Sequence, residues 1–234
     1  LERGGEVVAF GQGDLLACAR TEFARHADRL SVVSGDVCDA RTVDALFAGR
    51  RIAGVVHAAA VTAGPAREAR DPSAIVEVNL TGTIRVIEAA RRHGAGRIVY
   101  VGSGSAYGES LFSVPRLYED VTPSRPASMY GITKFAAERT ALRLGELWSL
   151  DLVGVRLGSV FGPWERDTGV RDTLSPHFQA ALLAASGSPL RYPEREVDRD
   201  YVYSRDVADG VLALLDAPRL AHRLYHLKIG RAHV

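Results

Sequence analysis

The sequence is poor in cysteine and has no long apolar run. Its two cysteines, Cys18 and Cys38, lack the paired spacing of a metal site, which excludes a disulfide scaffold and a zinc ribbon. We expect both to lie in core segments of an intracellular protein. No run approaches the roughly 18 apolar residues of a membrane span, and no charged and then apolar leader opens the chain. We therefore expect a cytoplasmic protein with no membrane partner.

An excess of charge of either sign is also absent. Lysine and arginine together number 29 and aspartate and glutamate 28, so the formal net charge is +1. This balance leaves no basic surface for a nucleic acid, and we expect no such partner. No cluster has the spacing of metal ligands, so no metal site is predicted. The 234 residues, 47% of them hydrophobic, suffice for one globular domain with a sizeable core.

Lysine is the scarcest of the charged residues. It occurs only at Lys134 and Lys228, although lysine and arginine together number 29. Lys134 lies in the helical pattern of residues 128–144, SMYGITKFAAERTALRL, where a slim ammonium stands in place of the usual planar guanidinium. Chance and function explain this equally well. The last residues, IGRAHV, match one reading frame of a common sequencing-adapter oligonucleotide, so we expect residues 228–234 to be a non-native tail.

Short apolar runs alternate with helical patterns along the chain. The runs that predict strands span residues 6–10, 29–36, 53–60, 97–103 and 150–158. They are continuously apolar, which is typical of a parallel sheet covered on both faces. Residues 71–94 predict a helix that begins at an Asp-Pro pair and ends at a glycine. This order predicts the α/β class, with a Rossmann-like, doubly wound parallel sheet.

Small and polar residues follow three of these strands. Asp36 follows the second predicted strand, residues 57–60 (HAAA) follow the third, and residues 102–108 (GSGSAYG) follow the fourth. In a doubly wound sheet, ligands bind at the carboxyl ends of the strands, where small residues let a flat ring or a ribose approach the backbone. Taken alone, each strand end is better explained by a tight turn between a strand and a helix.

A tyrosine and the scarce lysine complete the pattern. Tyr130 and Lys134 are four residues apart in a predicted helix, so they project from one face. The ammonium would favour the phenolate of Tyr130, which could then take or give a hydroxyl proton, and would also hydrogen-bond a cofactor ribose. Ser103 would orient the substrate oxygen and stabilise charge on it. This chemistry interconverts an alcohol and a ketone with hydride transfer.

With these motifs in order, the chain resembles the extended short-chain dehydrogenase/reductases, the NAD-dependent epimerase/dehydratase family that includes nucleotide-sugar epimerases. The motifs are GDVCD, VVHAAA, VNLTGT, YVGSGSAYG, YGITK, RLGSVFGP and RDYVYSRDVADG. The resemblance implies that Ser103, Tyr130 and Lys134 are catalytic. It implies cofactor contacts from Asp36, Val37, Ala58, Ala59, Ala60, Asn79, Tyr130 and Lys134, and substrate contacts from Ser105, Ser159 and Arg199. It also implies a nucleotide-linked sugar as substrate and a homodimer.

The resemblance also sets the expected domain boundaries. Residues 1–160 would form the dinucleotide-binding domain, and residues 161–227 a partial, smaller substrate lobe with returning Rossmann segments, followed by the tail. The opening LERGGEVVAF has the form of a helix end, a glycine turn and a strand. We therefore expect a chain truncated at both ends, without the first strand and its glycine-rich phosphate turn, and inactive as printed.

Departures from the family pattern bear on cofactor and reaction. Gly11 stands where an acidic residue usually ends the second strand of the family. Asp14 could substitute, or NADP could be accepted, but no arginine lies beside Gly11, which favours NAD. Gly104 and Ser105 stand where dehydratases carry an Asp-Glu pair, which argues against dehydration. Ser159 stands where nucleotide-sugar epimerases commonly carry asparagine, which leaves the substrate class open.

Other candidate residues carry weaker expectations. Arg199 resembles a diphosphate-contacting arginine, and pairing with a neighbouring aspartate explains it equally well. We expect His57 to be a packed core residue rather than a base or ligand. His177 could touch substrate, whereas Trp148 and Trp164 are expected to be packing residues.

The sequence therefore predicts an NAD(P)-dependent epimerase, most simply of a nucleotide sugar, that abstracts a hydride transiently and uses a tyrosine base. Two alternatives stay open. The first is a net NAD(P)-dependent sugar dehydrogenase or reductase. The second is a non-catalytic dinucleotide sensor on the same fold, although a sensor would have little reason to keep Ser103, Tyr130 and Lys134 together.

Overall fold

The structure of the protein, a computed structural model, describes residues 1–191 and 200–227. Its strands are β1 (Val7–Gly11), β2 (Leu30–Ser34), β3 (Gly54–His57), β4 (Arg97–Ser103), β5 (Leu152–Leu157), β6 (Ser159–Phe161), β7 (Tyr201–Tyr203) and β8 (Leu224–Leu227). Its α-helices are α1 (Ala17–Phe23), α2 (Ala40–Phe47), α3 (Pro65–Arg70), α4 (Pro72–Val76), α5 (Gly82–Arg92), α6 (Ser110–Ser113), α7 (Met129–Leu147), α8 (Pro176–Ala185) and α9 (Ser204–Asp216). Shorter helical turns span Ala24–Arg29, Glu77–Thr81 and Gly104–Tyr107.

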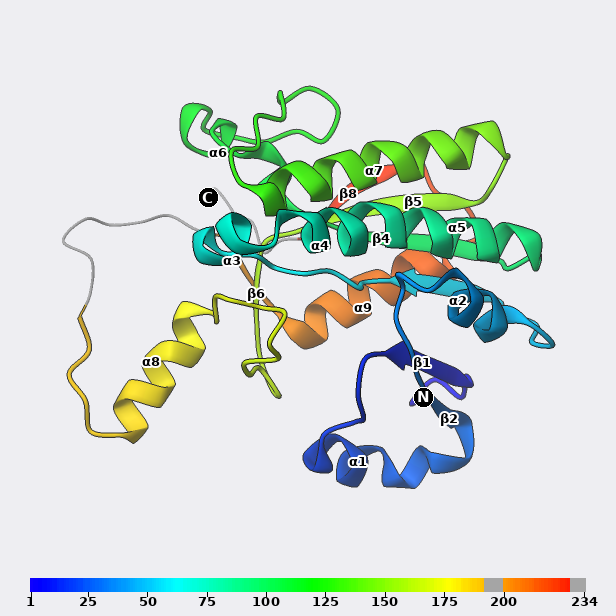
Figure 1. Ribbon diagram of the computed structural model, residues 1–234, viewed down its shortest axis with the longest axis horizontal. Helices are drawn as coiled ribbons and strands as arrows, with labels where there is room; N and C mark the ends of the chain where they lie inside the picture. Colours follow the sequence, from blue (N-terminus) through cyan, green and yellow to red (C-terminus); the bar gives the residue numbers. More distant parts are fainter. Residues whose placement is uncertain (192–199, 228–234) are drawn as a thin grey trace.

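All strand pairs are parallel, which confirms the predicted α/β class. The main sheet has the order β3-β4-β5-β8, so the chain returns to it at β8 after a long excursion. β1 pairs with β2, and β6 with β7, in separate two-stranded sheets. In Figure 1, the unit of β1, β2 and α1 lies below the main sheet. In the part of the chain that the structure describes, one edge of β1 and one edge of β3 carry no partner strand.

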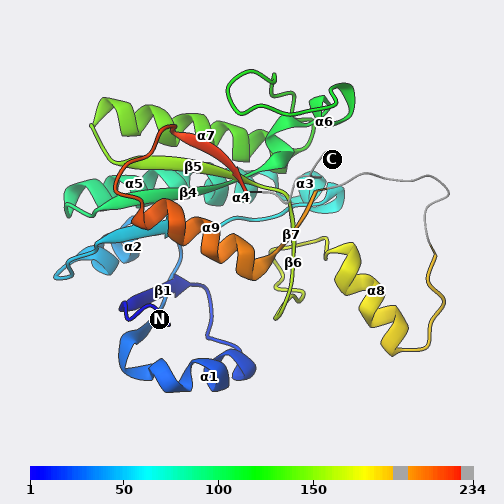
Figure 2. The same ribbon diagram turned by 180° about the vertical axis from the view of Figure 1, so that it is seen from behind.

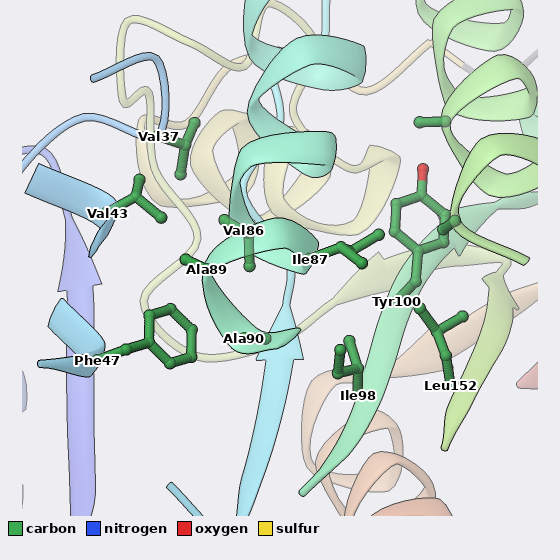
Figure 3. Packing of buried hydrophobic residues seen from close by; sticks show 12 residues of the cluster. Val37, Val43, Phe47, Val86, Ile87, Ala89, Ala90, Ile98, Tyr100 and Leu152 are labelled. Carbon is green, nitrogen blue, oxygen red and sulfur yellow. The ribbon is translucent and has the colours of Figure 1, made fainter. Parts of the chain in front are cut away.

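Helices cover both faces of the main sheet. α5 and α7 lie on one face, while α9 lies on the other, as the two opposite views show (Figures 1 and 2). On the first face, the core cluster includes Ile98 and Tyr100 of β4 and Ile87 of α5 (Figure 3). On the second face, Val153 of β5 packs with Val211 of α9. The apolar strand runs therefore predicted burial on both faces correctly for β4 and β5.

That expectation is wrong for the strands near the N-terminus. Val7 of β1 is 38% exposed and Val32 of β2 is 39% exposed, so the sheet they form is not covered on both faces. The physical reason is the pairing. Within the described residues, β1 and β2 hydrogen-bond to each other and not to the main sheet, so they lie outside the two helix layers that cover β4. The expected cysteine burial fails in the same unit, because Cys18 of α1 is exposed, while Cys38 is half-buried.

The helix predicted over residues 71–94 is built from three parts. Asp71 caps α4 by accepting a hydrogen bond from the backbone N–H of Ala74 at 3.3 Å. A π turn, Glu77–Thr81, then joins α4 to α5. The chain leaves α5 through Gly94, whose φ of +62° is the left-handed conformation that favours glycine. A single-turn π segment inside a helix is frequent at functional sites, and this one carries Asn79.

The first turn of α7 lies directly on the turn that follows β4. Ser128 caps the helix, and its Oγ accepts from the backbone N–H of Gly131 at 3.1 Å. A Cβ atom at Gly131 would lie 2.7 Å from the carbonyl oxygen of Ser105 and 3.1 Å from Cβ of Pro126. Only glycine permits this approach, which brings the helix carrying Tyr130 against the end of β4.

Gly131→Ala is therefore expected to destabilise the protein, although alanine is the better helix former. Because the clash is with backbone, we expect a loss of about 1–3 kcal/mol in the free energy of unfolding. Denaturant unfolding measures it, with Gly5→Ala as a control because nothing lies within 4 Å of a Cβ there. A Gly131→Ala protein as stable as its parent would refute the close approach.

The remaining sequence expectations concern packing residues and the membrane. Trp148 is half-buried under the guanidinium of Arg91, which lies 4.4 Å from the centre of its ring, whereas Trp164 is 39% exposed and meets Phe23 edge to face. Among residues 1–191 and 200–227, no helix combines the length and apolarity needed to cross a membrane. The expected boundary at residue 160 stays a prediction.

Candidate functional site

The ends of β1 and β2 meet at Asp36. Its carboxylate accepts hydrogen bonds from the backbone N–H of Cys38 at 2.8 Å and from Nε2 of Gln12 at 3.0 Å. The backbone hydrogen bond from Cys38 is the main cause of a lowered pKa at Asp36, so the carboxylate stays ionised. Gln12 follows Gly11, and sequence analysis missed it, although it stands next to the position where the family carries an acid. Asp14, the expected substitute, pairs instead with Arg20 at 3.1 Å.

The predicted cofactor residues after β2 and β3 differ in exposure. Val37 is only 7% exposed and packs against Gly82, where an added Cβ would lie 2.8 Å from a methyl carbon of Val37. Ala58 is exposed, while Ala59 and Ala60 are half-buried. The three alanines follow the carboxyl end of β3 and add little bulk there, and their contact with a cofactor stays a prediction.

Asn79 has a supporting position. It is 1% exposed, and its Oδ1 accepts from the backbone N–H of Val61 at 2.7 Å. Its Nδ2 donates to the carbonyl oxygen of Val61 and to Oγ1 of Thr133, both at 3.0 Å. These bonds tie the segment after β3 to α7, so the side chain of Asn79 supports the site from behind. A direct contact with the cofactor stays a prediction.

Ser103 ends β4 and is half-buried. Its Oγ accepts a hydrogen bond from the backbone N–H of Ser105 at 3.1 Å, and Ser105 is half-buried as well. Gly104 lies between them, where a Cβ would come within 3.3 Å of the carbonyl oxygen of Leu157. Tyr130, half-buried in the first turn of α7, belongs to the helix that packs on this same turn.

Lys134 is buried one turn after Tyr130. Only 3% of it is exposed, and its Nζ donates to the carbonyl oxygen of Val101 at 2.6 Å and lies 4.7 Å from the centre of the Tyr100 ring. Burial lowers the pKa of Lys134 to about 8, and the carboxylate of Glu138 opposes that fall. An ammonium has three N–H donors, so Val101 accepts only one of those available. A buried lysine of this kind can aim its other donors at a hydroxyl.

His57 is a packed core residue, as expected. It is 5% exposed, and its Nε2 lies 2.9 Å from Oγ1 of Thr83. Burial, assisted by the charge of Lys134, lowers the pKa of His57 to about 3. The ring is therefore neutral at physiological pH, and it is not a general base of ordinary strength.

The buried neutral His57 predicts an acid sensitivity of stability. An unfolded histidine titrates near 6.5 and the folded one near 3, so between these values the unfolded chain binds more protons. Stability from this group is complete above pH 6.5 and is lost as the pH falls towards 3. We expect His57→Gln to flatten the decline by up to about 1.4 kcal/mol per pH unit. Denaturant unfolding at several pH values measures it, and equal slopes in parent and variant would contradict it.

The structure describes Ser159 and His177 but not Arg199 among the residues predicted to contact the substrate. Ser159 is exposed at the start of β6, and its backbone N–H donates to the carbonyl oxygen of Asp200 at 2.9 Å. Arg199 lies outside the described residues. His177 of α8 packs between Phe161 and Tyr201, with ring centres 4.3 Å and 4.4 Å away, so its neighbours in the structure are aromatic.

Sequence analysis also missed a buried ion pair, Glu138 with Arg156. The signal was present: Arg156 interrupts the apolar run of β5, and a charge in a buried strand needs a partner. Residues 1–191 and 200–227 hold no group of three or more His, Cys, Asp or Glu side chains placed to bind a metal ion.

The fold and these motifs define a Rossmann-like enzyme family. The NAD dependent epimerase/dehydratase family matches residues 4–230, and the chain belongs to it. UDP-glucuronate 4-epimerase 3 of Arabidopsis thaliana is 32% identical over 188 residues, which cover 79% of this chain and 42% of that protein. GDP-6-deoxy-D-mannose reductase of Pseudomonas aeruginosa is 27% identical over 162 residues, which cover 69% of this chain and 53% of that protein.

A solved structure shows the same fold. The dTDP-glucose 4,6-dehydratase of Bacillus anthracis, crystallised with NAD, superposes with a TM-score of 0.79 at 19% identity, covering 97% of this chain and 67% of that one. At that identity, the likeness concerns the fold alone. The matches to the two relatives span about two fifths and about half of their lengths, so the activity of a whole protein is a matter for proposal.

Proposed function

We propose that this chain is part of an NAD-dependent 4-epimerase of a nucleotide sugar. The observation that carries the proposal is the placement of Tyr130 and Lys134 one turn apart on α7, with the buried ammonium of Lys134 held against β4, the strand that ends in Ser103. Membership of the family alone does not choose between epimerisation and dehydration, since its name covers both. The epimerase relatives support epimerisation.

The residues present fit a dinucleotide. Lys134 has donors beyond the one that Val101 accepts, which suits a ribose hydroxyl. The small side chains of Ala58 to Ala60 leave space at the end of β3, and the ionised Asp36 can accept from an adenine amine. NAD, when bound, supplies the acceptor and donor of the hydride. We favour NAD over NADP because the residue after Gly11 is the neutral Gln12, and because Arg20, nearby in the sequence, is paired with Asp14.

In the proposed reaction, Tyr130 takes the proton of the sugar hydroxyl as that carbon loses its hydride, and returns it when the hydride comes back on the other face. Lys134 stabilises the phenolate and orients the ribose, while Ser103 hydrogen-bonds the reacting oxygen. Ser105 and Ser159 would contact the substrate. The family resemblance implies the same role for Arg199, which lies outside the described residues. Gly104 and Ser105 place no carboxylic acid beside Ser103, which argues against loss of water. A cytoplasmic homodimer belongs to the same proposal.

A net reductase is the second candidate, favoured by the match to GDP-6-deoxy-D-mannose reductase. Both candidates are tested by incubating the full-length protein with a panel of UDP-, GDP- and dTDP-sugars and either NAD or NADP. Epimerisation predicts a C4 epimer by proton NMR with only catalytic NAD and a flat absorbance at 340 nm. Reduced cofactor consumed or formed in proportion to product would decide for the reductase, and no reaction together with tight NAD binding would favour a sensor.

A further inference from the structure

A row of three residues crosses the main sheet just before the strand ends. Gly102 of β4 is paired with Arg156 of β5, and Arg156 is paired with His226 of β8. Residues paired in a parallel sheet share a face, and this face is the one covered by α7, since Tyr100, two residues before Gly102, packs there. Ser103 follows Gly102 immediately, so the row lies directly beneath the candidate site.

The centre of the row carries a fully buried ion pair. Glu138 of α7 is 0% exposed and Arg156 is 3% exposed, and two hydrogen bonds join them, from Nε to Oε2 at 2.7 Å and from Nη2 to Oε1 at 2.6 Å. Gly102 makes room, because an added Cβ would lie 3.4 Å from Oε2 of Glu138 and 2.9 Å from the carbonyl oxygen of Val155. A buried ion pair adds little net stability, so stability alone does not explain why Glu138 and Arg156 are paired at this position.

The pair reaches the turn after β4 through Tyr107. The guanidinium of Arg156 lies over the ring of Tyr107, 4.3 Å from its centre. The hydroxyl of Tyr107 lies 2.7 Å from Nε2 of His226 and donates to the carbonyl oxygen of Tyr118 at 3.1 Å. Arg156 therefore contacts both α7 and the turn that begins after Ser103.

Glu138 stands one helical turn beyond Lys134, on the same buried side of α7. Few ionisable groups face Lys134. β3 presents the neutral His57, β4 presents Tyr100, α7 itself presents Tyr130 and Glu138, and Arg156 of β5 stands behind Glu138. Burial alone disfavours the ammonium, and among these groups it is the carboxylate of Glu138 that opposes that effect.

We infer that Glu138 and Arg156 form a positioning pair for Lys134, in which Arg156 fixes the Glu138 carboxylate one helical turn from the buried lysine, whose ammonium lies against β4. The inference rests on the proposed function only in giving Lys134 a catalytic task. Neither member of the pair is proposed to touch substrate or cofactor.

The scarcity of lysine makes a direct test possible. Lysine labelled with ¹³C at Cε gives two signals in this chain, from Lys134 and Lys228, and Lys228→Arg identifies them. In the parent chain, the Lys134 signal is expected to titrate near pH 8, against an ordinary value of 10.5. In Glu138→Gln, it is expected to titrate about 1 pH unit lower, because the opposing charge is gone. Titration of the parent near 10.5, or an unchanged midpoint in Glu138→Gln, would overturn the inference.

Two further variants separate positioning from folding. Glu138→Gln with Arg156→Gln leaves no unpaired buried charge. Because the nearby Arg156 cation is removed as well, its Lys134 midpoint is expected to lie above that of the single variant and below that of the parent. Glu146→Gln removes an exposed carboxylate of the same helix, paired with Arg143, and is expected to leave the midpoint unchanged. If both Glu138 variants fail to fold while the Glu146 control folds, the pair has a structural role only and the inference is wrong.

The titration tests the positioning pair, and the turnover measurement tests the proposed function, so the two hypotheses can be rejected separately. If Lys134 moves as expected in the Glu138 variants but the full-length protein tolerates replacement of Lys134, the positioning pair stands and the proposed function falls. If replacement of Lys134 abolishes turnover but the midpoint does not move in the Glu138 variants, the proposed function stands and the positioning pair falls.

Discussion

Tyr130→Phe in the full-length protein is expected to lose nearly all turnover, about 10²- to 10⁴-fold in kcat, the range that a positioned acid or base supplies. Only one hydroxyl is removed from the first turn of α7, so the packing of this turn against Ser105 through Gly131 is kept. NAD binding, measured by calorimetry, should weaken far less than turnover, because only one of the implied cofactor contacts is changed. The proton of the sugar hydroxyl would simply have no acceptor.

The matched control is Tyr225→Phe, which removes a hydroxyl on the opposite face of the main sheet, where Tyr225 packs with the α9 cluster. This variant should keep the parent rate at temperatures below its melting point. Parent turnover in Tyr130→Phe would remove the base from the proposed reaction, whatever the nature of the substrate.

Lys134→Arg is expected to cost about 10²-fold or more in kcat/KM, although it preserves the charge. The ammonium occupies a buried space bounded by the ring of Tyr100 and the carbonyl oxygen of Val101. A planar guanidinium is broader than an ammonium, so in this space it would displace the Tyr100 ring or the Val101 carbonyl. If it pointed out of the space instead, it would crowd the cofactor ribose. Weaker NAD binding by calorimetry should accompany the loss of rate.

Arg143→Lys serves as the control for this exchange, since it makes the reverse swap of cations at an exposed position of the same helix. It should leave rate and binding unaltered. Equal kcat/KM in Lys134→Arg and its parent would show that the position accepts any cation, and the scarcity of lysine would then have no catalytic meaning.

Local sequence patterns were sufficient for β1 to β5 and for the helix that carries Tyr130 and Lys134, whereas they did not predict β6, β7 and β8. β4 and β5 are mostly apolar along their length, and this pattern predicts a strand of a parallel sheet that is buried on both faces. The burial of Lys134 was not predicted as such, because a single cation in a helical pattern is normally placed on the solvated side. The helical pattern did predict that Tyr130 and Lys134, four residues apart, lie on one face of the helix.

The features that escaped prediction depend on partners distant in the chain. Arg156 could be recognised as a charge in an apolar strand, but the choice of Glu138 as its partner follows from the β4–β5 register and from the absence of a side chain at Gly102. Gln12 meets Asp36 only because β1 pairs with β2 in parallel. The separate β1–β2 sheet likewise depends on which strands find neighbours, and no local pattern reports that.

The central claim is that a hydride leaves the sugar and returns to the same carbon within one turnover. The most direct measurement takes the nucleotide sugar from the panel on which the full-length protein acts, labels it with deuterium at C4, and follows the label in the presence of unlabelled NAD. We expect a 4-epimer that keeps its deuterium at C4, with no build-up of reduced cofactor. Loss of the label from C4, or deuterated reduced cofactor accumulating in proportion to a keto product, would contradict it.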